Sequence, residues 1–441
     1  SEPFYAETLR PRDLTTKGEP VLVAGGSLST SGSPRIVRLY RPRLAMGGYL
    51  EYGRSSGVQL EMWRRKGDDV LVPLENAITR RLLPAQEMVG ETVERYGQTW
   101  PTIRHMFDEL ASDVNFEIDM IFSWVDGTDK DFQRARAKRM ESYVVGEGDD
   151  SEARYRQIDE LKYALRSVYM FAPWVRTIYI ATDSPRPSWL DDHPRVKIMR
   201  SEDFFVDTSV LPTHNSQAVE AQLHNIPGLS EYYIYSNDDM FFGRPLSPDM
   251  FFSPGGLTKF IEATTRIGLG ENDVTRSGFE NAARVNRRLL HERFGRVTTR
   301  HLEHTAAPMR KSVVQDLERE FPDEFRATAA SPFRAADNIS VTNSLYHYYA
   351  LLTGRAVQKL GARVLYVDTT MKSGLAQLKK LLKTRDYDFF CLNDGSFPEV
   401  SPEERARRMR SFLDRYFALP APWERPLTTA VTPAESTPTA S

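Results

Sequence analysis

The sequence predicts an α/β protein with an open, largely parallel, Rossmann-like sheet, a helical C-terminal part and a small β-rich N-terminal module. The sheet is predicted from short apolar runs that alternate with stretches of helical periodicity. These runs lie at residues 118–127, 175–183, 195–203 and 231–239. Apolar runs of this length are typical of strands buried on both faces, and their alternation with helices favours parallel pairing.

Length, charge and cysteine content limit the number of domains and the kinds of partner and compartment to be expected. The chain has 441 residues, enough for two or three domains. Its 58 Lys and Arg residues nearly balance its 60 Asp and Glu residues, so charge gives no reason to expect nucleic acid as a partner. The single cysteine, Cys391, excludes an intrachain disulfide and a zinc site built on several cysteines. We therefore expect a protein of a reducing compartment, the cytoplasm.

The two ends of the chain carry no sign of a membrane segment. No apolar stretch reaches the roughly 18 residues of a membrane span, and the first residues lack the basic and apolar regions of a signal peptide. These patterns predict a soluble protein without a membrane span. Residues 401–425 are expected to form a C-terminal helix, and residues 426–441, rich in Thr, Pro, Ala and Ser, a disordered tail.

Residues 1–115 are expected to form the N-terminal module. Up to about residue 83, short alternating runs are separated by Gly- and Ser-rich turns, which indicates antiparallel strands and hairpins. From about 84 to 115, acidic and apolar residues are mixed in a pattern that favours a helical linker. The α/β domain is expected to follow over residues 116–400.

The clearest helix is predicted around residues 159–173. Leu161 and Leu165 belong to an apolar stripe on one face, and Pro173 ends the helix. Arg166 lies on the same helix and forms an i,i+4 basic face with Lys162, for which a solvated surface is the simple explanation. Beyond about residue 250 the pattern becomes mostly helical.

The carboxyl ends of the predicted strands are acidic. Asp126 follows the first apolar run, and the adjacent Asp238 and Asp239 follow the fourth. In an open α/β sheet, ligands bind outside the carboxyl ends of the strands. Paired carboxylates there suit Mg²⁺ or Mn²⁺, which complete their shell with substrate phosphates. The apolar residues on both sides of the pair favour this nucleotide-phosphate site over the alternative of a solvated strand end or helix cap.

Histidines suggest two further kinds of chemistry. His301 and His304 are three residues apart, a spacing that can place both on one helical face as zinc ligands, although no third ligand is evident. A single histidine can instead act as a general base, because an unperturbed pKa of about 6.5 leaves the imidazole neutral at pH 7. The sequence pattern alone does not say which histidine this is.

Four segments together resemble the Stealth family of sugar-phosphate transferases. They include IDMIFSWVDGTD at 118–129, APWVRTIYIATD and YYIYSNDDMFFG in the long second block, HTAAPMRKSVVQDLEREF from residue 304, and CLNDG at 391–395. The family includes bacterial capsular and exopolysaccharide phosphotransferases and the lysosomal-enzyme GlcNAc-1-phosphotransferase of animals. The resemblance covers residues 118–395 and implies a sheet of the glycosyltransferase-A-like type.

The resemblance implies a reaction. It implies transfer of a hexose 1-phosphate, most often GlcNAc 1-phosphate, from a UDP-sugar to a hydroxyl of a glycan or polysaccharide, with release of UMP, in capsule or exopolysaccharide synthesis. The alternative is a metal-dependent glycosyltransferase that releases UDP, and a third possibility is a non-catalytic polysaccharide-binding module. The acceptor stays open. The N-terminal module could bind it, pack on the catalytic domain or form a homodimer.

The resemblance also implies roles for residues of this chain. Asp238, Asp239 and Asp394 would hold Mg²⁺ or Mn²⁺ against the donor pyrophosphate, which makes Asp239 catalytic as well. His304 would be the general base, and Arg334 would pair with phosphoryl oxygens, because a guanidinium can hold two oxygens at once. The remaining residues expected to bind substrate are Trp124, Asp126, Asn215, Arg166 and Asn393.

Overall fold

The computed structural model describes residues 4–24, 35–45, 50–54, 57–75, 79–140, 158–395 and 398–425. The chain divides into two compact units between Asp113 and Val114, and each is described by itself. The predicted disordered tail at 426–441 lies outside the described residues.

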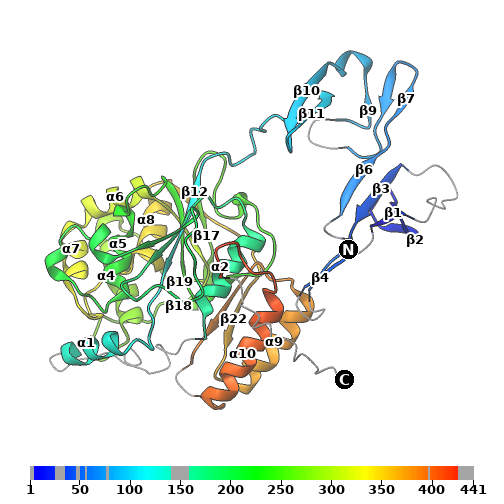
Figure 1. Ribbon diagram of the computed structural model, residues 1–441. Helices are drawn as coiled ribbons and strands as arrows, with labels where there is room; N and C mark the ends of the chain where they lie inside the picture. The colour runs from blue at the N-terminus through cyan, green and yellow to red at the C-terminus, as the bar shows by residue number, and fades with distance from the viewer. Residues whose placement is uncertain are drawn as a thin grey trace, which may run out of the picture. The chain divides into compact units, whose positions relative to one another are not determined.

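The N-terminal unit is β-rich, as predicted, and its strands are short and antiparallel (Figure 1). Its largest sheet has the strand order β2-β1-β3-β6. The strands are β1 (Tyr5–Leu9), β2 (Thr16–Leu22), β3 (Ile36–Tyr40), β4 (Arg43–Ala45), β5 (Leu50–Tyr52), β6 (Val58–Glu61), β7 (Arg64–Lys66), β8 (Asp69–Leu71), β9 (Leu82–Leu83), β10 (Gly90–Arg95) and β11 (Gln98–Ile103).

The predicted helical linker at 84–115 is wrong. Apart from a single 3₁₀ turn, the regular structure within it is the antiparallel hairpin β10–β11. Tyr96 and Gly97 form the hairpin turn with φ angles of 55° and 72°, in the left-handed region that two-residue hairpin turns require. The acidic and apolar residues that suggested a helix therefore lie on a largely exposed hairpin.

The second unit is built on a five-stranded sheet in the order β14-β13-β12-β15-β20. Its strands are β12 (Ile118–Ser123), β13 (Ile178–Ala181), β14 (Val196–Met199), β15 (Tyr232–Asn237) and β20 (Ala307–Arg310). The first four in chain order are parallel, and β20 pairs antiparallel at the edge. This arrangement confirms the predicted Rossmann-like sheet. The strand order reverses at β12, so the switch point, where such sheets bind ligands, lies between β12 and β15.

Helices cover both faces of this sheet (Figure 1). The α-helices of this unit are α1 (Lys130–Met140), α2 (Glu160–Phe171), α3 (Ser201–Phe204), α4 (Ser216–Glu220), α5 (Gly278–Phe294), α6 (Lys311–Glu320), α7 (Pro322–Ala330), α8 (Tyr346–Leu352), α9 (Lys372–Thr384) and α10 (Pro402–Tyr416), with a π-helix η7 (Val341–Leu345) before α8. The predicted helix at 159–173 is confirmed as α2. Among the described residues, no helix combines the length and apolar character needed to cross a membrane.

The strands divide their side chains between two hydrophobic cores. On β12, Met120 and Phe122 face the core that also contains residues of α2, α9 and α10. Ile121 faces the opposite core, which contains residues of α4 to α8. Because successive side chains of a strand point to opposite faces, both faces of β12 have to be apolar, and this explains its continuous apolar run.

The C-terminal part is mostly helical, as predicted, but it also supplies a second sheet. Strands β16 (Met240–Phe242), β23 (Phe389–Asn393) and β22 (Val364–Asp368) have the order β16-β23-β22. The remaining strands of this unit are β17 (Thr258–Phe260), β18 (Glu262–Arg266), β19 (Arg300–Leu302) and β21 (Ala356–Gln358). Two residues, Asp238 and Asp239, separate β15 from β16, so the chain passes directly from the main sheet into the second one.

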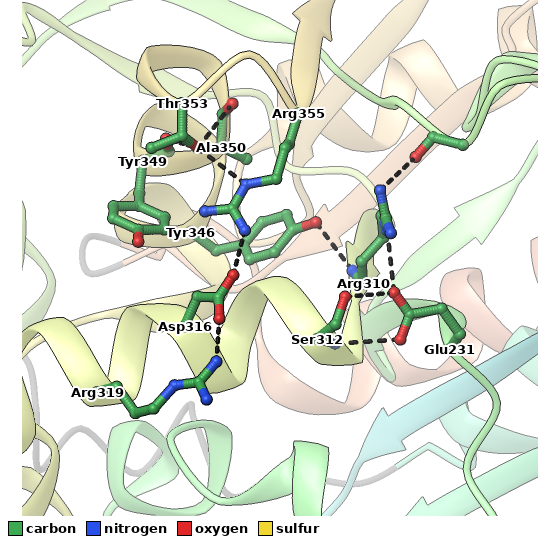
Figure 2. A network of polar contacts seen from close by, with 11 residues as sticks. Glu231, Arg310, Ser312, Asp316, Arg319, Tyr346, Tyr349, Ala350, Thr353 and Arg355 are labelled. Carbon is green, nitrogen blue, oxygen red and sulfur yellow. Dashed lines mark hydrogen bonds and ion pairs between the residues drawn. The ribbon is translucent and has the colours of Figure 1, made fainter.

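A polar network at the amino end of β15 fixes the edge of the main sheet (Figure 2). Glu231 accepts hydrogen bonds from Nε of Arg310 (3.0 Å) and from the backbone N–H of Ser312 (3.1 Å). Arg310 is the N-cap residue of α6 but makes no side-chain cap bond. Glu231 therefore caps α6 from a neighbouring element and ties it to the edge strand β20.

We expect Glu231→Ala to lower the free energy of unfolding by about 1–3 kcal/mol, because the start of α6 loses a charged cap and Arg310 loses its partner. The midpoint of urea denaturation measures this change. As a control, Glu292→Ala removes an exposed carboxylate that meets Arg288 at 3.4 Å on α5, and it should change stability by less than about 0.5 kcal/mol. Equal midpoints for the two variants would contradict the capping role.

Candidate active site

The switch point of the main sheet is formed by the last residues of β12 and β15. Ser123 and Asn237 end these strands and are register partners. Trp124 follows Ser123, is buried in the core, and donates its backbone N–H to the carbonyl of Ala181 at the end of β13 (3.1 Å). The structure therefore places Trp124 at the switch point, with its ring largely inside the protein.

Asp126 forms the turn that leaves this edge. Its Oδ1 accepts hydrogen bonds from the N–H and hydroxyl of Thr128, at 2.9 and 2.7 Å. Its own N–H donates to the hydroxyl of Ser184, in the loop after β13 (2.8 Å). The carboxylate thus stabilises the turn after β12, and its role in substrate binding stays a prediction.

Asp239 carries a buried carboxyl group between the two sheets. Its Oδ2 accepts a hydrogen bond from the thiol of Cys391 (3.5 Å), while its Oδ1 is buried without a hydrogen-bond partner. Burial raises the pKa of Asp239 to about 6, and the negative charge of nearby Asp394 adds to the rise. The preceding Asp238 is half-buried, and its charge reaches Cys391.

Asp394 reaches this position from the end of β23. Because β23 runs antiparallel to β16, the N–H of Leu392 donates to the carbonyl of Asp239 (2.9 Å), and the end of β23 meets the start of β16. Oδ1 of Asp394 accepts a hydrogen bond from the hydroxyl of Thr369 (2.9 Å) and forms an ion pair with Arg405. The structure therefore brings together two of the three carboxylates predicted for the metal ion.

Two charged residues beside Asp394 were missed by the sequence analysis. Glu160, at the start of α2, is 6% exposed, and Arg405, on α10, is 4% exposed. Oε1 of Glu160 lies 3.9 Å from Nη2 of Arg405. Burial raises the pKa of Glu160 to about 7, with the positive charge of Arg405 opposing the rise and the negative charge of Asp394 adding to it.

A signal for both residues was present in the sequence. Glu160 precedes Ala164 and Val168 by one and two helical turns, so it lies on the buried stripe of α2. Arg405 stands in the same relation to Met409 and Leu413 on α10. A charged residue that continues an apolar stripe at this spacing has to be buried with the stripe.

His304 is connected to the end of β23, which carries Asp394, through the side chain of Tyr366. Its ring is centred 5.1 Å from that of Tyr366, and the hydroxyl of Tyr366 accepts a hydrogen bond from Nδ2 of Asn393, the neighbour of Asp394. His304 is partly open to solvent, but partial loss of water around its ring, and secondly the nearby His301, lower its pKa. A lowered pKa keeps the imidazole neutral at pH 7, which is the form that accepts a proton.

The helical face considered for a zinc site is not present. His301 belongs to strand β19, and His304 lies in the loop after it. The ring of His301 is buried and stacks on that of Phe279 at 4.7 Å between centroids. His301 is therefore accounted for by packing within the domain.

Asn215 and Arg334 lie together beside α4. Asn215 is 1% exposed and caps α4, because its Oδ1 accepts the N–H of Gln217 (3.1 Å). Its Nδ2 donates to the carbonyl of Phe333 (3.2 Å), the neighbour of Arg334. Arg334 itself donates from Nη2 to the hydroxyl of Ser216 (2.8 Å). Asn215 therefore stabilises the loop that carries Arg334 through these hydrogen bonds.

A buried glutamate connects Arg334 to the end of β15. Glu220 accepts hydrogen bonds from the hydroxyls of Thr342 (2.6 Å), on the π-helix η7, and Tyr235 (3.2 Å). Burial raises the pKa of Glu220, and the nearby charge of Arg334 opposes the rise. The same Tyr235 hydroxyl lies 2.8 Å from Oδ1 of Asn237, an alternative acceptor for its single proton, so Arg334 lies near the switch point.

Arg166 is engaged elsewhere. Its Nε and Nη2 donate to the carboxylate of Glu424 at 2.6 and 2.7 Å, and Nη1 donates to the carbonyl of Phe417 (2.8 Å). Arg166 and Glu424 are both almost fully buried at their side chains. The face predicted as substrate-binding or solvated therefore joins α2 to the C-terminal segment, and these contacts do not support a role in substrate binding.

The carboxylates of Asp239 and Asp394 fit a divalent cation of the kind predicted. Among the described residues, no group of three or more His, Cys, Asp and Glu side chains is arranged to hold a metal ion. Mg²⁺ needs only one or two protein carboxylates when substrate phosphates complete its shell. Asp239 offers a buried oxygen without a hydrogen-bond partner, close to the carboxylate of Asp394, so the donor set is suitable.

Four family models match the chain, described as the conserved regions of Stealth proteins. Conserved region 1 matches residues 116–144, region 2 residues 154–260, region 3 residues 303–351 and region 4 residues 379–431. The chain belongs to the Stealth family. Each of the four Stealth regions contributes to the site just described: Asp126 in the first, Asp239 in the second, His304 in the third and Asp394 in the fourth.

Several Stealth relatives are similar over most of the chain. The exopolysaccharide phosphotransferase CpsY of Mycobacterium tuberculosis strain H37Rv is 62% identical over 96% of this chain and 79% of that protein. An exopolysaccharide phosphotransferase of Nocardia farcinica is 55% identical over 94% of this chain and 80% of that protein.

A solved galactosyltransferase, LgtC in complex with donor and acceptor sugar analogues, has a TM-score of 0.33 and 9% identity, over 69% of this chain and 96% of that one. At that distance the likeness carries no argument about activity.

We expect Arg166→Met to lower the free energy of unfolding by about 3 kcal/mol, because the buried carboxylate of Glu424 keeps only Lys162, at 3.6 Å, as a charged partner. Thermal denaturation measures the loss, and Arg288→Met on the exposed face of α5 is the matched control, with an expected change of less than about 0.5 kcal/mol. Unchanged stability together with a raised donor KM would instead restore Arg166 to the substrate-binding residues.

Proposed function

We propose that this Stealth protein transfers a hexose 1-phosphate from a UDP-sugar to a hydroxyl of an exopolysaccharide acceptor and releases UMP. GlcNAc 1-phosphate is the group we expect first. The observation that carries the proposal is the approach of Asp239 and Asp394 to one another beside the switch point of the sheet, with Tyr366 linking the ring of His304 to Asn393, the neighbour of Asp394. The names of the relatives support the class of reaction and the type of acceptor.

His304 is the general base of the proposed reaction. Its imidazole accepts the proton of the acceptor hydroxyl as the oxygen attacks the β-phosphorus of the donor. The bond from the β-phosphorus to the oxygen bridging the two phosphates breaks, and UMP leaves with that oxygen. The aromatic rings of Tyr366 and Phe279 lie beside the imidazole of His304, with centroids at 5.1 and 6.3 Å, and support its position.

Arg334 balances the charge of the reacting phosphoryl group. A guanidinium holds two oxygens at once and stays charged at any working pH. Ser216 and the loop held by Asn215 fix the position of this side chain before substrate binds. Trp124, Asp126 and Asn393 are proposed to line the donor site at the ends of β12 and β23.

Asp238, Asp239 and Asp394 are the residues that would hold Mg²⁺ or Mn²⁺. When bound, such an ion neutralises the donor pyrophosphate and the charge that develops on the leaving UMP. The buried oxygen of Asp239 is suited to this because a protein group does not already occupy it with a hydrogen bond.

The first experiment is to incubate the full chain with UDP-GlcNAc and Mg²⁺, with and without EDTA, and to resolve the nucleotide products. We expect UMP that disappears when EDTA is added. Release of UDP would contradict the proposal and indicate transfer of the sugar alone. If no nucleotide is released, a panel of other UDP-sugars with polysaccharide fragments as acceptors follows, and UMP from none of them would also contradict it.

We expect His304→Ala to lower kcat by at least about 100-fold with the fold intact, the usual size of a general-base effect. His291→Ala, which removes an exposed histidine on α5, is the control and should keep full activity. Because the pKa of His304 is lowered, wild-type kcat should stay level at neutral pH and fall only as the pH drops through a value below about 6.5. Unchanged kcat in His304→Ala would remove this residue from the mechanism.

A further inference from the structure

Arg405 is a buried arginine that touches the site from the C-terminal helix. Its Nη2 forms an ion pair with Oδ1 of Asp394, and its Nε donates to the hydroxyl of Thr369 (2.8 Å). Thr369 donates in turn to the same Oδ1 of Asp394 (2.9 Å). The three side chains therefore close a ring in which one oxygen of Asp394 receives both bonds.

This ring restricts the rotation of the Asp394 carboxylate. A carboxylate held at one oxygen by a single donor can turn about that bond, whereas two donors from different elements fix its plane. Thr369 follows β22 and Arg405 lies on α10, so the two donors approach from different parts of the domain. Arginine suits this position because its planar fork presents several N–H groups in fixed directions, which lysine does not.

Arg405 also offsets like charges in the same place. Glu160 lies 3.9 Å from its Nη2, and the carboxylate of Asp394 is within reach of both Glu160 and Asp239. Buried carboxylates that approach one another are unfavourable unless a positive group lies between them. The guanidinium of Arg405 supplies that charge from inside the protein.

We propose that Arg405, acting with Thr369, is a positioning residue of this Stealth site that sets the orientation of the Asp394 carboxylate toward the donor pyrophosphate and its metal ion. The proposal rests on the proposed function for the role of Asp394. Neither residue touches the substrate in this proposal, since both act through Asp394. The competing explanation is that Arg405 serves only to dock α10 onto the second sheet.

The test compares Arg405→Met, Arg405→Lys and Thr369→Val with the control Arg408→Met. Arg408 lies on the same helix but on its exposed face, paired with Glu404 at 2.7 Å. Circular dichroism and thermal denaturation first establish that each variant is folded at the assay temperature. For Arg405→Met we expect kcat to fall by about 10-fold to 100-fold with a nearly unchanged KM for the donor, the usual effect of losing a partner of a metal ligand. Arg405→Lys should lose less, and Arg408→Met nothing.

A double-mutant cycle separates positioning from docking. If Arg405 acts through Asp394, Arg405→Met should cause no further loss of kcat in an Asp394→Asn background. A docking role predicts that the two losses multiply. Multiplying losses, or an Arg405→Met variant as active as Arg408→Met, would overturn the inference.

A binding measurement makes the inference independent of turnover. Free Mn²⁺ is followed by electron paramagnetic resonance while the full chain is titrated in the presence of UMP. We expect Arg405→Met and Thr369→Val to weaken Mn²⁺ binding by about tenfold or more, and Arg408→Met to leave it unchanged. If the wild type binds Mn²⁺ but releases no UMP, the proposed function fails, while equal Mn²⁺ affinity of Arg405→Met and wild type overturns the positioning role alone.

Discussion

The passage of the chain from one sheet to the other through Asp238 and Asp239 is the constraint on which the site depends. β16 begins directly after these residues and pairs antiparallel with β23, so the start of one strand meets the end of the other. β22 runs parallel to β23 and ends at the same edge. Residues that are far apart in the sequence therefore arrive at one place because of strand direction, before any side chain contributes.

Close backbone packing at this edge leaves little freedom. Asp368, the last residue of β22, accepts the N–H of Gly395 (3.2 Å). A Cβ atom at position 395 would lie 2.0 Å from Oδ2 of Asp368, so a larger residue after Asp394 would displace the Asp368 side chain and its hydrogen bond to the loop. The loop is thereby held against β22, and Asp394 is kept near Asp239.

The site is electrostatically unfavourable on its own. Asp239 has a buried oxygen without a hydrogen-bond partner, and the charge of Asp394 raises its pKa further. Such a group costs free energy that the rest of the domain has to supply. The two hydrophobic cores on opposite faces of the main sheet supply the stabilising free energy that offsets this burial. A bound cation would remove the unfavourable free energy of the buried carboxylates. This arrangement is consistent with the metal and donor pyrophosphate that we propose for the site.

The sequence predicted the strands and the acidic strand ends well, because buried parallel strands leave a plain apolar signal. Asp126 and Asp239 were proposed as site residues in this way, whereas Asp394 came only from the family resemblance, since a single acid after CLN has no pattern of its own. The helix predicted near residues 96 and 97 failed because a two-residue turn outweighs the charge pattern around it.

Buried charges on helices were harder to predict. Glu160 was not considered because a carboxylate at the start of a helix usually faces water and favours the helix dipole. Arg166 was considered, but its partner, Glu424, lies at the far end of the chain, and no local pattern shows such a pairing. A buried charged residue on a helix can be recognised because it occupies a position of the apolar stripe. Its partner, when it lies far away in the sequence, can be identified only from the tertiary structure.

The two residues that connect His304 and Asp394 to β22 and the turn after it lie outside the four Stealth regions. Tyr366 contacts His304 and Asn393, and Thr369 contacts Asp394 and Arg405. Both belong to β22 and the turn after it, between the third and fourth matched regions. β22 is therefore more than a spacer, because it aligns the imidazole and the carboxylate of Asp394 against one rigid strand. If this strand shifted, the imidazole of His304 and the carboxylate of Asp394 would move with it, so their relative position would change little.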